Sequence, residues 1–477
     1  MGDEIGNSEF KDVDYSNYWN KLASETRLLQ QMFQDRCFED GHAMFGLEQE
    51  AWIIDQAYQP APENPYLLKQ VKSDLLSPEL AKFNIELNVT PQRLAGDGIQ
   101  QIHQELSELW SKCEQGISSR KLKLQMIGIL PTVKDSDLTL NNMSEMNRYR
   151  ALNEQVLKFR DGKPIHLDIV GTEHLKRDHD DVMLESAATS LQIHRQIPAD
   201  QSARFYNASI ILSAISVAVA ANSPYLFESQ LWEETRIPLF EQAVEIGGYG
   251  NASRGPIRRV TFGSGYAKES ILECFNENLD HYPVLLPVEF NADESELKYL
   301  RMHNGTIWRW NRPLIGFDEN KKPHLRIEHR VVSAGPTIMD EMANAVFFCG
   351  LQEYYATIED APEGRLEFSD AKINFYASAQ HGLDTKIRWL DGKKIAINHL
   401  ILDELLDHSQ KGLQQLDVNS DLIDEYLNVI RARVSNKQTG ASWQKKFIAT
   451  HGKNVAALTE TYWKNQQSGV PVHLWEI

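Results

Sequence analysis

Four segments of the chain alternate hydrophobic and polar side chains with a period of two, which is typical of strands with one buried face. These segments are Phe45–Ile54, Phe83–Thr90, Ser190–Ile197 and Leu325–Val332. Helical spacing of hydrophobic residues is found at Tyr15–Cys37, Gly98–Gly116, Ser144–Phe159 and Asp200–Ala221. A further strand is predicted at Leu122–Leu130, a helix is entered at Pro336 and Thr337, and the chain beyond about Ile395 is mostly helical. Because strands and helices alternate irregularly and no G-x-G-x-x-G follows a strand, the pattern favours an α+β fold with a largely antiparallel sheet.

The polar faces of the four predicted strands carry charged side chains. Residues two apart share a face, so each strand presents a set of polar groups opposite its aliphatic residues. These sets are Glu48 and Glu50; Glu86, Asn88 and Thr90; Gln192 and His194; and Arg326, Glu328 and Arg330. In one antiparallel sheet, the four strands would bring their carboxylates together. For any single strand, an ordinary solvated face is the alternative interpretation.

Four carboxylates in one cleft raise each other's pKa unless a counter-charge is present. A divalent cation is the usual counter-charge, and oxygen ligands suit Mg²⁺ or Mn²⁺ better than zinc. The predicted metal ligands are Glu48, Glu50, Glu86 and Glu328. Metal in such a site typically bridges phosphate oxygens.

Several arginines could add an anion site, because guanidinium groups bind phosphate and carboxylate bidentately. Arg326 and Arg330 flank Glu328 on its own face, whereas Arg236, Arg258, Arg259 and Arg312 lie in predicted loops. The glycine-rich segment 247–265 does not have the P-loop pattern, so it is either a flexible lid or a long surface loop. Trp308 and Trp310 are more typical of core packing than of a ring platform.

Composition narrows the classes of function. The chain has 477 residues and a net charge of −18, which argues against nucleic-acid binding. Its four cysteines lie far apart, as in a reduced protein without a disulfide framework. The first residues have no apolar signal core, and the most apolar run, Ala208–Ala221, is too short to span a bilayer. We therefore expect a cytoplasmic protein that binds no membrane, with Ala208–Ala221 in a buried helix.

A series of short motifs lies along the chain in a fixed order. They include Gly46-Leu47-Glu48-Gln49-Glu50, Glu86-Leu87 followed by Thr90, Asn147-Arg148-Tyr149, Gln192-Ile193-His194, Asn222-Ser223-Pro224-Tyr225, Thr235-Arg236, Arg312-Pro313, Arg326-Ile327-Glu328-His329-Arg330, and Asn374-Phe375 with Gly382-Leu383. In this order they resemble the second class of the glutamate–cysteine ligase family, which includes bacterial carboxylate–amine ligases. The resemblance covers about Phe45 to Leu383.

This resemblance implies a glutamine-synthetase-like curved sheet, largely antiparallel, with helices packed on its outer face and ATP and Mg²⁺ on its concave face. It implies that Glu48, Glu50, Glu86 and Glu328 are metal ligands and that His194 is a metal, nucleotide or substrate ligand. It also implies nucleotide contacts for Arg326 and Arg330, and catalytic or anion-binding roles for Arg330, Arg312 and Arg236. A catalytic domain is expected at residues 45–390, between an N-terminal helical segment (1–44) and a C-terminal helical extension (391–477).

The predicted function is an ATP-dependent carboxylate–amine ligase of small molecules, which forms an amide through an acyl phosphate, on glutamate or a similar acid, as in glutathione biosynthesis. Two departures from the family pattern stand out: Thr90 is shifted by one residue, and Gln192 replaces the first histidine of an H-x-H pair. Two alternatives stay open, a phosphotransferase acting on a guanidino or carboxylate acceptor and a non-catalytic Mg-nucleotide-binding protein. A homodimer is also left open.

Overall fold

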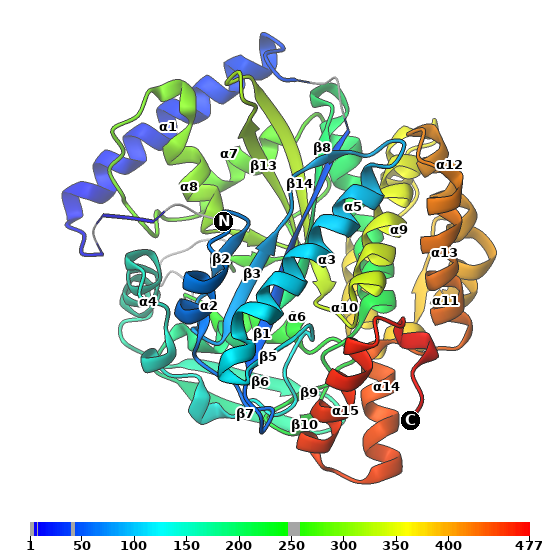
Figure 1. The fold of residues 1–477 in the computed structure, drawn as a ribbon. Coiled ribbons are helices and arrows are strands. Elements are labelled where there is room, and N and C mark those ends of the chain that lie inside the picture. Colours follow the sequence, from blue (N-terminus) through cyan, green and yellow to red (C-terminus); the bar gives the residue numbers. More distant parts are fainter. Residues whose placement is uncertain (1–3, 7, 40–42, 247–257) are drawn as a thin grey trace.

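The four predicted strands lie side by side in one antiparallel sheet of the computed structural model, which describes residues 4–6, 8–39, 43–246 and 258–477 (Figure 1). The sheet has eight strands in this part of the chain, and its main path runs β13-β14-β8-β1-β3-β2, with β4 and β5 also paired to β1. Their bounds are β13 (Asn311–Phe317), β14 (Pro323–Ser333), β8 (Ser190–Ile197), β1 (Met44–Ile54), β3 (Asn84–Asn88), β2 (Leu76–Pro78), β4 (Gln92–Arg93) and β5 (Lys123–Gln125). All pairs within this sheet are antiparallel, which confirms the predicted fold class.

One face of the sheet belongs to the main hydrophobic core. Its aliphatic side chains include Leu47, Ile85, Leu87, Ile193 and Ile327, each almost completely buried. The helices next to this face are α3 (Gly98–Ile117), α5 (Ser202–Ala220) and α9 (Ile338–Thr357), and α10 (Phe368–His381) packs on α5. Because alternation sends the aliphatic residues into this core, the charged residues of the same strands face the opposite side.

Helix α5 is apolar around its whole circumference, as expected of a helix with no solvent face. With the turn before it, it spans Ala199–Ala220, has a mean hydropathy of 1.4 in its most apolar window, and is long and apolar enough to cross a bilayer by composition alone. The apolar run Ala208–Ala221, which is predicted from the sequence to be too short to span a bilayer, is the C-terminal part of this longer helix. However, 94% of that window is buried within the protein, which is typical of a core helix and agrees with the predicted buried helix.

The predicted strand Leu122–Leu130 is much shorter in the structure, where β5 ends at Gln125. Beyond this point, side chains replace the strand ladder as hydrogen-bond partners of the backbone. The amide of Met126 donates to the side chain of Gln466, and its carbonyl accepts from Tyr462. The carbonyl of Ile127 accepts from Trp52 and Thr189. These bonds satisfy the backbone without a neighbouring strand.

Further helices and hairpins surround the opposite, charged side of the sheet. They are α1 (Asp12–Gln34), α4 (Asn147–Phe159), the hairpin β6 (Ile165–Val170) and β7 (His174–His179), the short strands β9 (Tyr225–Leu226) and β10 (Ser229–Gln230), α6 (Arg236–Ala243), α7 (Leu272–His281), α8 (Lys298–Gly305), and β11 (Val260–Thr261) with β12 (Trp308–Arg309). Helix α2 (Asn64–Val71) instead packs on α3. Helix α8 contacts α1, α7 and β13, which places it over one end of the sheet.

The C-terminal part is mostly helical, as predicted. After the hairpin β15 (Lys386–Arg388) and β16 (Lys394–Ala396) come α11 (Ile397–Leu400), α12 (Leu406–Gln415), α13 (Ser420–Ser435), α14 (Gly440–His451) and α15 (Val455–Gln467). Helices α12 and α13 pack on α9, and form an outer layer beside it (Figure 1). The domain boundaries after residues 44 and 390 stay predictions.

Candidate active site

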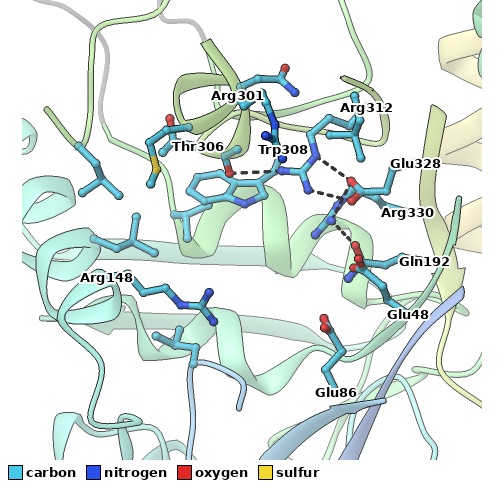
Figure 2. Close-up of a pocket in the computed structure, with 18 of the residues that line it drawn as sticks. Glu48, Glu86, Arg148, Gln192, Arg301, Thr306, Trp308, Arg312, Glu328 and Arg330 are labelled. Atoms are coloured by element: carbon cyan, nitrogen blue, oxygen red, sulfur yellow. Dashed lines mark hydrogen bonds and ion pairs between the residues drawn. The ribbon is translucent and has the colours of Figure 1, made fainter. Parts of the chain in front are cut away.

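A cavity of about 330 Å³ lies against the charged face of the sheet (Figure 2). Its acidic and neutral polar lining includes Glu48, Glu50, Glu79, Glu86, Glu185, Gln192, His194 and Glu328. Its basic lining consists of Arg148, Lys298, Arg301, Arg312, Arg326 and Arg330. An apolar wall completes it, with Phe240, Phe275, Leu286, Phe290, Met302 and Trp308. The cavity therefore joins an acidic region, a basic region and an apolar region.

The strand register explains why residues distant in sequence meet here. Glu50 on β1 is directly opposite Glu86 on β3, and Glu48 is opposite Gln192 on β8. On the other side of β8, His194 is opposite Glu328 on β14. Directly opposite residues have close side chains. The structure thus brings together all four predicted metal ligands and His194.

One potential metal site consists of Glu48, His194 and Glu328, which we call the histidine group. One ligand atom from each lies within 4.8 Å of the others. His194 Nε2 is 3.2 Å from Glu48 Oε1 and 3.7 Å from Glu328 Oε1. Both ring nitrogens of His194 are buried and have no hydrogen-bond partner among the described residues. A buried imidazole nitrogen facing two carboxylates fits a divalent cation.

A second potential site consists of Glu50, Glu79 and Glu86, which we call the carboxylate group; its ligand atoms also lie within 4.8 Å of one another. Burial and the neighbouring Glu48 raise the pKa of Glu86 to about 8. Burial and the charges of Glu86 and Glu50 also raise the pKa of Glu79 well above its usual value. Raised pKa values of this kind mark an acidic cluster that lacks counter-charge, which a divalent cation would supply.

The basic side of the cavity is organised around Glu328. Arg312 pairs with it bidentately, through Nε at 2.7 Å and Nη2 at 2.9 Å, and Arg330 Nη1 lies 3.0 Å from the same carboxylate. Although burial acts in the opposite direction, these two guanidinium groups lower the pKa of Glu328 well below its usual value. Figure 2 shows Arg312 and Arg330 converging on Glu328 from two sides.

Arg326 lies on the same strand face, but its guanidinium group makes no hydrogen bond or ion pair within the described residues, and its Nε is buried. Burial lowers the pKa of Arg326 despite the charges of Glu48 and Glu328. A partnerless buried cation at a cavity wall is a natural contact for an anion such as phosphate. Arg301, from helix α8, extends toward the same region (Figure 2).

Arg236 does not line this cavity, contrary to the expectation of an anion contact. Its guanidinium group donates to the backbone carbonyls of Arg330 and Val331 and pairs with Glu234 at 3.2 Å. These partners occupy it inside the protein, where it supports strand β14. We therefore leave Arg236 out of the proposed substrate contacts.

The other predicted basic residues also lie elsewhere. Arg258 pairs with Glu245 at 3.3 Å, and Arg259 donates to the backbone of Thr306. Much of the glycine-rich segment 247–265, including Arg254, lies outside the described residues. Trp310 is a core residue, as predicted, whereas Trp308 lines the cavity.

Sequence reasoning missed several residues of the cavity. Glu79 follows the short strand β2, Glu185 lies in the 3-10 segment Val182–Ala187, and Lys298 and Arg301 lie on helix α8. None of these belongs to an alternating strand, which was the pattern that revealed the others. Arg148 belonged to a sequence motif but received no role; it extends into the cavity from α4 (Figure 2).

Both the sequence and the fold of this chain are similar to those of known proteins. Residues 44–462 match the sequence model of glutamate-cysteine ligase family 2, beyond the region in which the short motifs lie. No curated protein matches the chain. Among solved structures, a glutamate–cysteine ligase from Francisella tularensis, in complex with AMP, has a similar fold with a TM-score of 0.56 at 12% identity, over 90% of each chain. A bifunctional glutathione synthetase from Pasteurella multocida has a TM-score of 0.49 at 12% identity, over 94% of this chain and 55% of its own.

Proposed function

Because the chain belongs to glutamate-cysteine ligase family 2, and is thus an ATP-dependent ligase that forms carbon–nitrogen bonds, we propose that it joins the γ-carboxyl group of glutamate, or of a similar acid, to a small-molecule amine. The single observation that supports this function best is the convergence, in one cavity, of two potential metal sites and a group of arginines. This combination suits a reaction in which phosphate charge must be neutralised.

The residues that would hold metal are the histidine group, Glu48, His194 and Glu328, and the carboxylate group, Glu50, Glu79 and Glu86. Mg²⁺ is the proposed ion, with Mn²⁺ as the close alternative, because five of the six ligands are carboxylates. When bound, the ions would supply positive charge beside the phosphate oxygens.

The arginines have a complementary role. We propose that three arginines contact the nucleotide phosphates. They are Arg326, which has no partner among the residues that the structure describes, and Arg312 and Arg330, which lie around Glu328. Their planar guanidinium groups would hold the γ-phosphate in line with the attacking carboxylate, and stabilise the charge that develops during transfer. A negatively charged cavity would otherwise repel ATP.

The proposed chemistry has two steps. An oxygen of the acid's carboxylate attacks the γ-phosphorus of ATP, and the bond to ADP breaks, which gives an acyl phosphate. The neutral amine then forms a bond to the acyl carbon, the bond to phosphate breaks, and the nitrogen proton leaves with the departing phosphate. The products are an amide, ADP and hydrogen phosphate. Neither step needs a covalent bond to the protein.

Glutamate and cysteine are the first substrates to test, because the family and the Francisella tularensis enzyme are named for this pair. Joining them would place the enzyme in glutathione biosynthesis. The apolar wall, with Phe240, Phe275 and Trp308, leaves room in the same cavity for a nucleobase or an apolar side chain. The proposed partners are small-molecule substrates, and the proposed location is the cytoplasm.

The decisive experiment is a phosphate-release screen of acids and amines in pairs, with ATP and Mg²⁺, followed by mass spectrometry of the products. A ligase releases free phosphate and forms an amide only when both substrates are present. Accumulation of a phosphorylated acceptor would instead identify a phosphotransferase. Binding of Mg-ATP without turnover on any pair would contradict the proposed reaction.

A further inference from the structure

Glu185 is a carboxylate of the cavity that neither potential metal site uses. It lines the same cavity as the two sites, but it is not a member of the histidine group or of the carboxylate group. Its side chain makes no hydrogen bond or ion pair with the part of the chain that the structure describes. When it is ionised, a carboxylate placed against a substrate cavity in this way can accept hydrogen bonds with both of its oxygens.

The segment that carries Glu185 is fixed in place. Its neighbours Met183, Leu184 and Ser186 are buried. Asp181 caps the segment through the amide of Met183 at 2.9 Å, and Asn153 accepts a hydrogen bond from the amide of Val182 at 3.1 Å. The position of Glu185 is therefore set by packing rather than by a partner of its own carboxylate.

The surroundings of Glu185 favour a cation. Burial and the charge of Glu50 raise the pKa of Glu185 to about 8, and the smaller effect of Arg330 acts against them. The charge of Glu185 in turn contributes to the raised pKa of Glu79. Negative charge at this point thus becomes more favourable when a positive group lies next to it.

The location also indicates which cation. The pKa of Glu185 is affected by the charges of Glu50 and Arg330. Gln192 is hydrogen-bonded to both of these residues, and so lies at the boundary between the carboxylate group and the arginines that we propose to contact phosphate. In the proposed reaction, the acyl phosphate forms at this boundary, and the acceptor nitrogen must approach it. Amino acids and simple amines arrive at neutral pH as ammonium ions, and these can donate hydrogen bonds to a carboxylate.

We propose that Glu185 binds the ammonium group of the acceptor substrate and holds its nitrogen beside the acyl phosphate, where the ammonium group gives up one proton to the solvent and the resulting neutral amine attacks. This inference rests on the proposed function. Glu185 would select a positively charged acceptor, and the other side chains of the cavity would bind ATP and the acid.

The test compares two acceptors of different charge. Amide formation from glutamate and cysteine, or from the best pair in the screen, is measured beside hydroxamate formation from the same acid and hydroxylamine, which is uncharged at neutral pH. Glu185→Gln keeps the shape of the side chain and removes its charge. We expect the KM for the ammonium acceptor to rise at least about tenfold, while the KM values for acid and ATP in the hydroxamate assay stay within about twofold of wild type.

Glu79→Gln is the matched comparison, since it makes the same substitution in the carboxylate group. It should reduce amide and hydroxamate formation together and raise the Mg²⁺ concentration needed for half-maximal rate. Equal losses with both acceptors in Glu185→Gln, or a raised KM for the acid with hydroxylamine, would overturn the assignment of Glu185 to the acceptor.

Hydroxamate formation also reports whether the variant is folded. If Glu185→Gln forms no hydroxamate, the test is repeated with Glu185→Asp. This variant keeps the negative charge on a side chain that is one methylene shorter, and we again expect a selective rise in the KM for the acceptor. Failure of both variants in the hydroxamate assay would overturn the inference, because Glu185 would then be needed before the amine enters. A wild-type protein inactive with every pair would refute the proposed function itself, whereas an active wild type with unselective variants would refute only the role of Glu185.

Discussion

Gln192 is hydrogen-bonded to Arg330 and to Glu50 at the same time: its amide oxygen accepts from Arg330 Nη1, and its amide nitrogen donates to Glu50 Oε1 at 2.8 Å. Arg330 also pairs with Glu328, and the amide of Ser190 donates to the other oxygen of Glu50. Gln192 therefore links the carboxylate group to the arginines around Glu328. The residue that departs from the family's H-x-H pattern has a defined structural role here.

Replacing Gln192 tests this role. Leucine has a similar size but can neither donate nor accept, so Gln192→Leu removes one hydrogen-bond partner from Arg330 and one from Glu50. Hydrogen bonds to charged groups contribute about 1.5–3 kcal/mol, which predicts a loss in kcat/KM of about 10- to 100-fold. Gln192→His should retain more activity than the leucine variant, because a neutral imidazole also has one donor and one acceptor. Steady-state phosphate release measures both.

Gln196→Leu is the control for this comparison. Gln196 lies on the same strand, but its amide donates to the backbone carbonyl of Glu39, outside the cavity. This variant should retain wild-type kcat/KM. Wild-type kinetics in Gln192→Leu would show that the link between Glu50 and Arg330 has no part in the reaction.

Glu328 is the side chain on which the histidine group and two arginines converge. Glu328→Gln removes a predicted metal ligand and the charge that Arg312 and Arg330 pair with. We expect kcat to fall by about 10²–10³ and the Mg²⁺ concentration needed for half-maximal phosphate release to rise. Glu353→Gln, which removes the partner of Arg195 outside the cavity, should lower Tm without changing the Mg²⁺ dependence. Full metal-dependent turnover in Glu328→Gln would remove Glu328 from the site.

The residues that could be predicted from the sequence share one property: they lie on strands whose period is visible without a structure. Glu86 lies between Ile85 and Leu87, and Glu48, His194 and Glu328 each follow a buried aliphatic residue. The strand register then places these residues and Glu50 close to one another. The sheet, and the face that carries the site, follow from the same pattern.

The residues that could not be predicted come from segments without such a period. Glu79 follows Pro78 at the end of a three-residue strand, and Glu185 lies in a six-residue 3-10 segment. For Arg236 the sequence suggests a role in the site that the contacts do not support. A basic residue in a motif is expected to bind an anion, but the guanidinium group of Arg236 contacts Glu234 and two backbone carbonyls inside the protein. Tertiary contacts of this kind leave no local trace in the sequence.

We expect Arg326 to destabilise the folded protein without ligands and to bind the phosphates of ATP. Its guanidinium group lacks an ion-pair or hydrogen-bond partner among the described residues, and a buried charge without a partner is unfavourable. We expect Arg326→Met to raise the KM for ATP at least about tenfold, with a Tm equal to or above that of wild type. Calorimetry without ligands and kinetics with varied ATP measure the two effects.

Arg195→Met provides the contrast, because Arg195 is also buried on a neighbouring strand but pairs with Glu353 and donates to the carbonyl of Cys349 at 3.0 Å. Breaking that pair should lower Tm clearly. If Arg326→Met lowered Tm as much as Arg195→Met and left the KM for ATP unchanged, Arg326 would have a purely structural role.

Mg²⁺ should stabilise the protein more at alkaline pH than at acidic pH. The pKa of Glu86 is raised to about 8 by burial and Glu48, and the pKa of Glu79 is raised by burial and by Glu86. A folded-state pKa above the unfolded value means that the folded chain retains protons that the unfolded chain has released. The contribution of these groups to stability is therefore present below about pH 4.5 and is lost as pH rises through about 8. A divalent cation in the carboxylate group replaces the lost protons, so its stabilising effect should grow over the same interval.

Thermal unfolding at pH 6, 7, 8 and 9, with and without saturating Mg²⁺, measures this effect as the shift in Tm at each pH. Potassium chloride of equal ionic strength controls for screening, which acts on surface charges at every pH. Glu86→Gln removes the titrating group opposite Glu50 and should make the Mg²⁺-induced shift smaller and less dependent on pH. A shift that is equal at all four pH values in the wild type, or larger at pH 6 than at pH 9, would contradict a cation site formed by Glu50, Glu79 and Glu86.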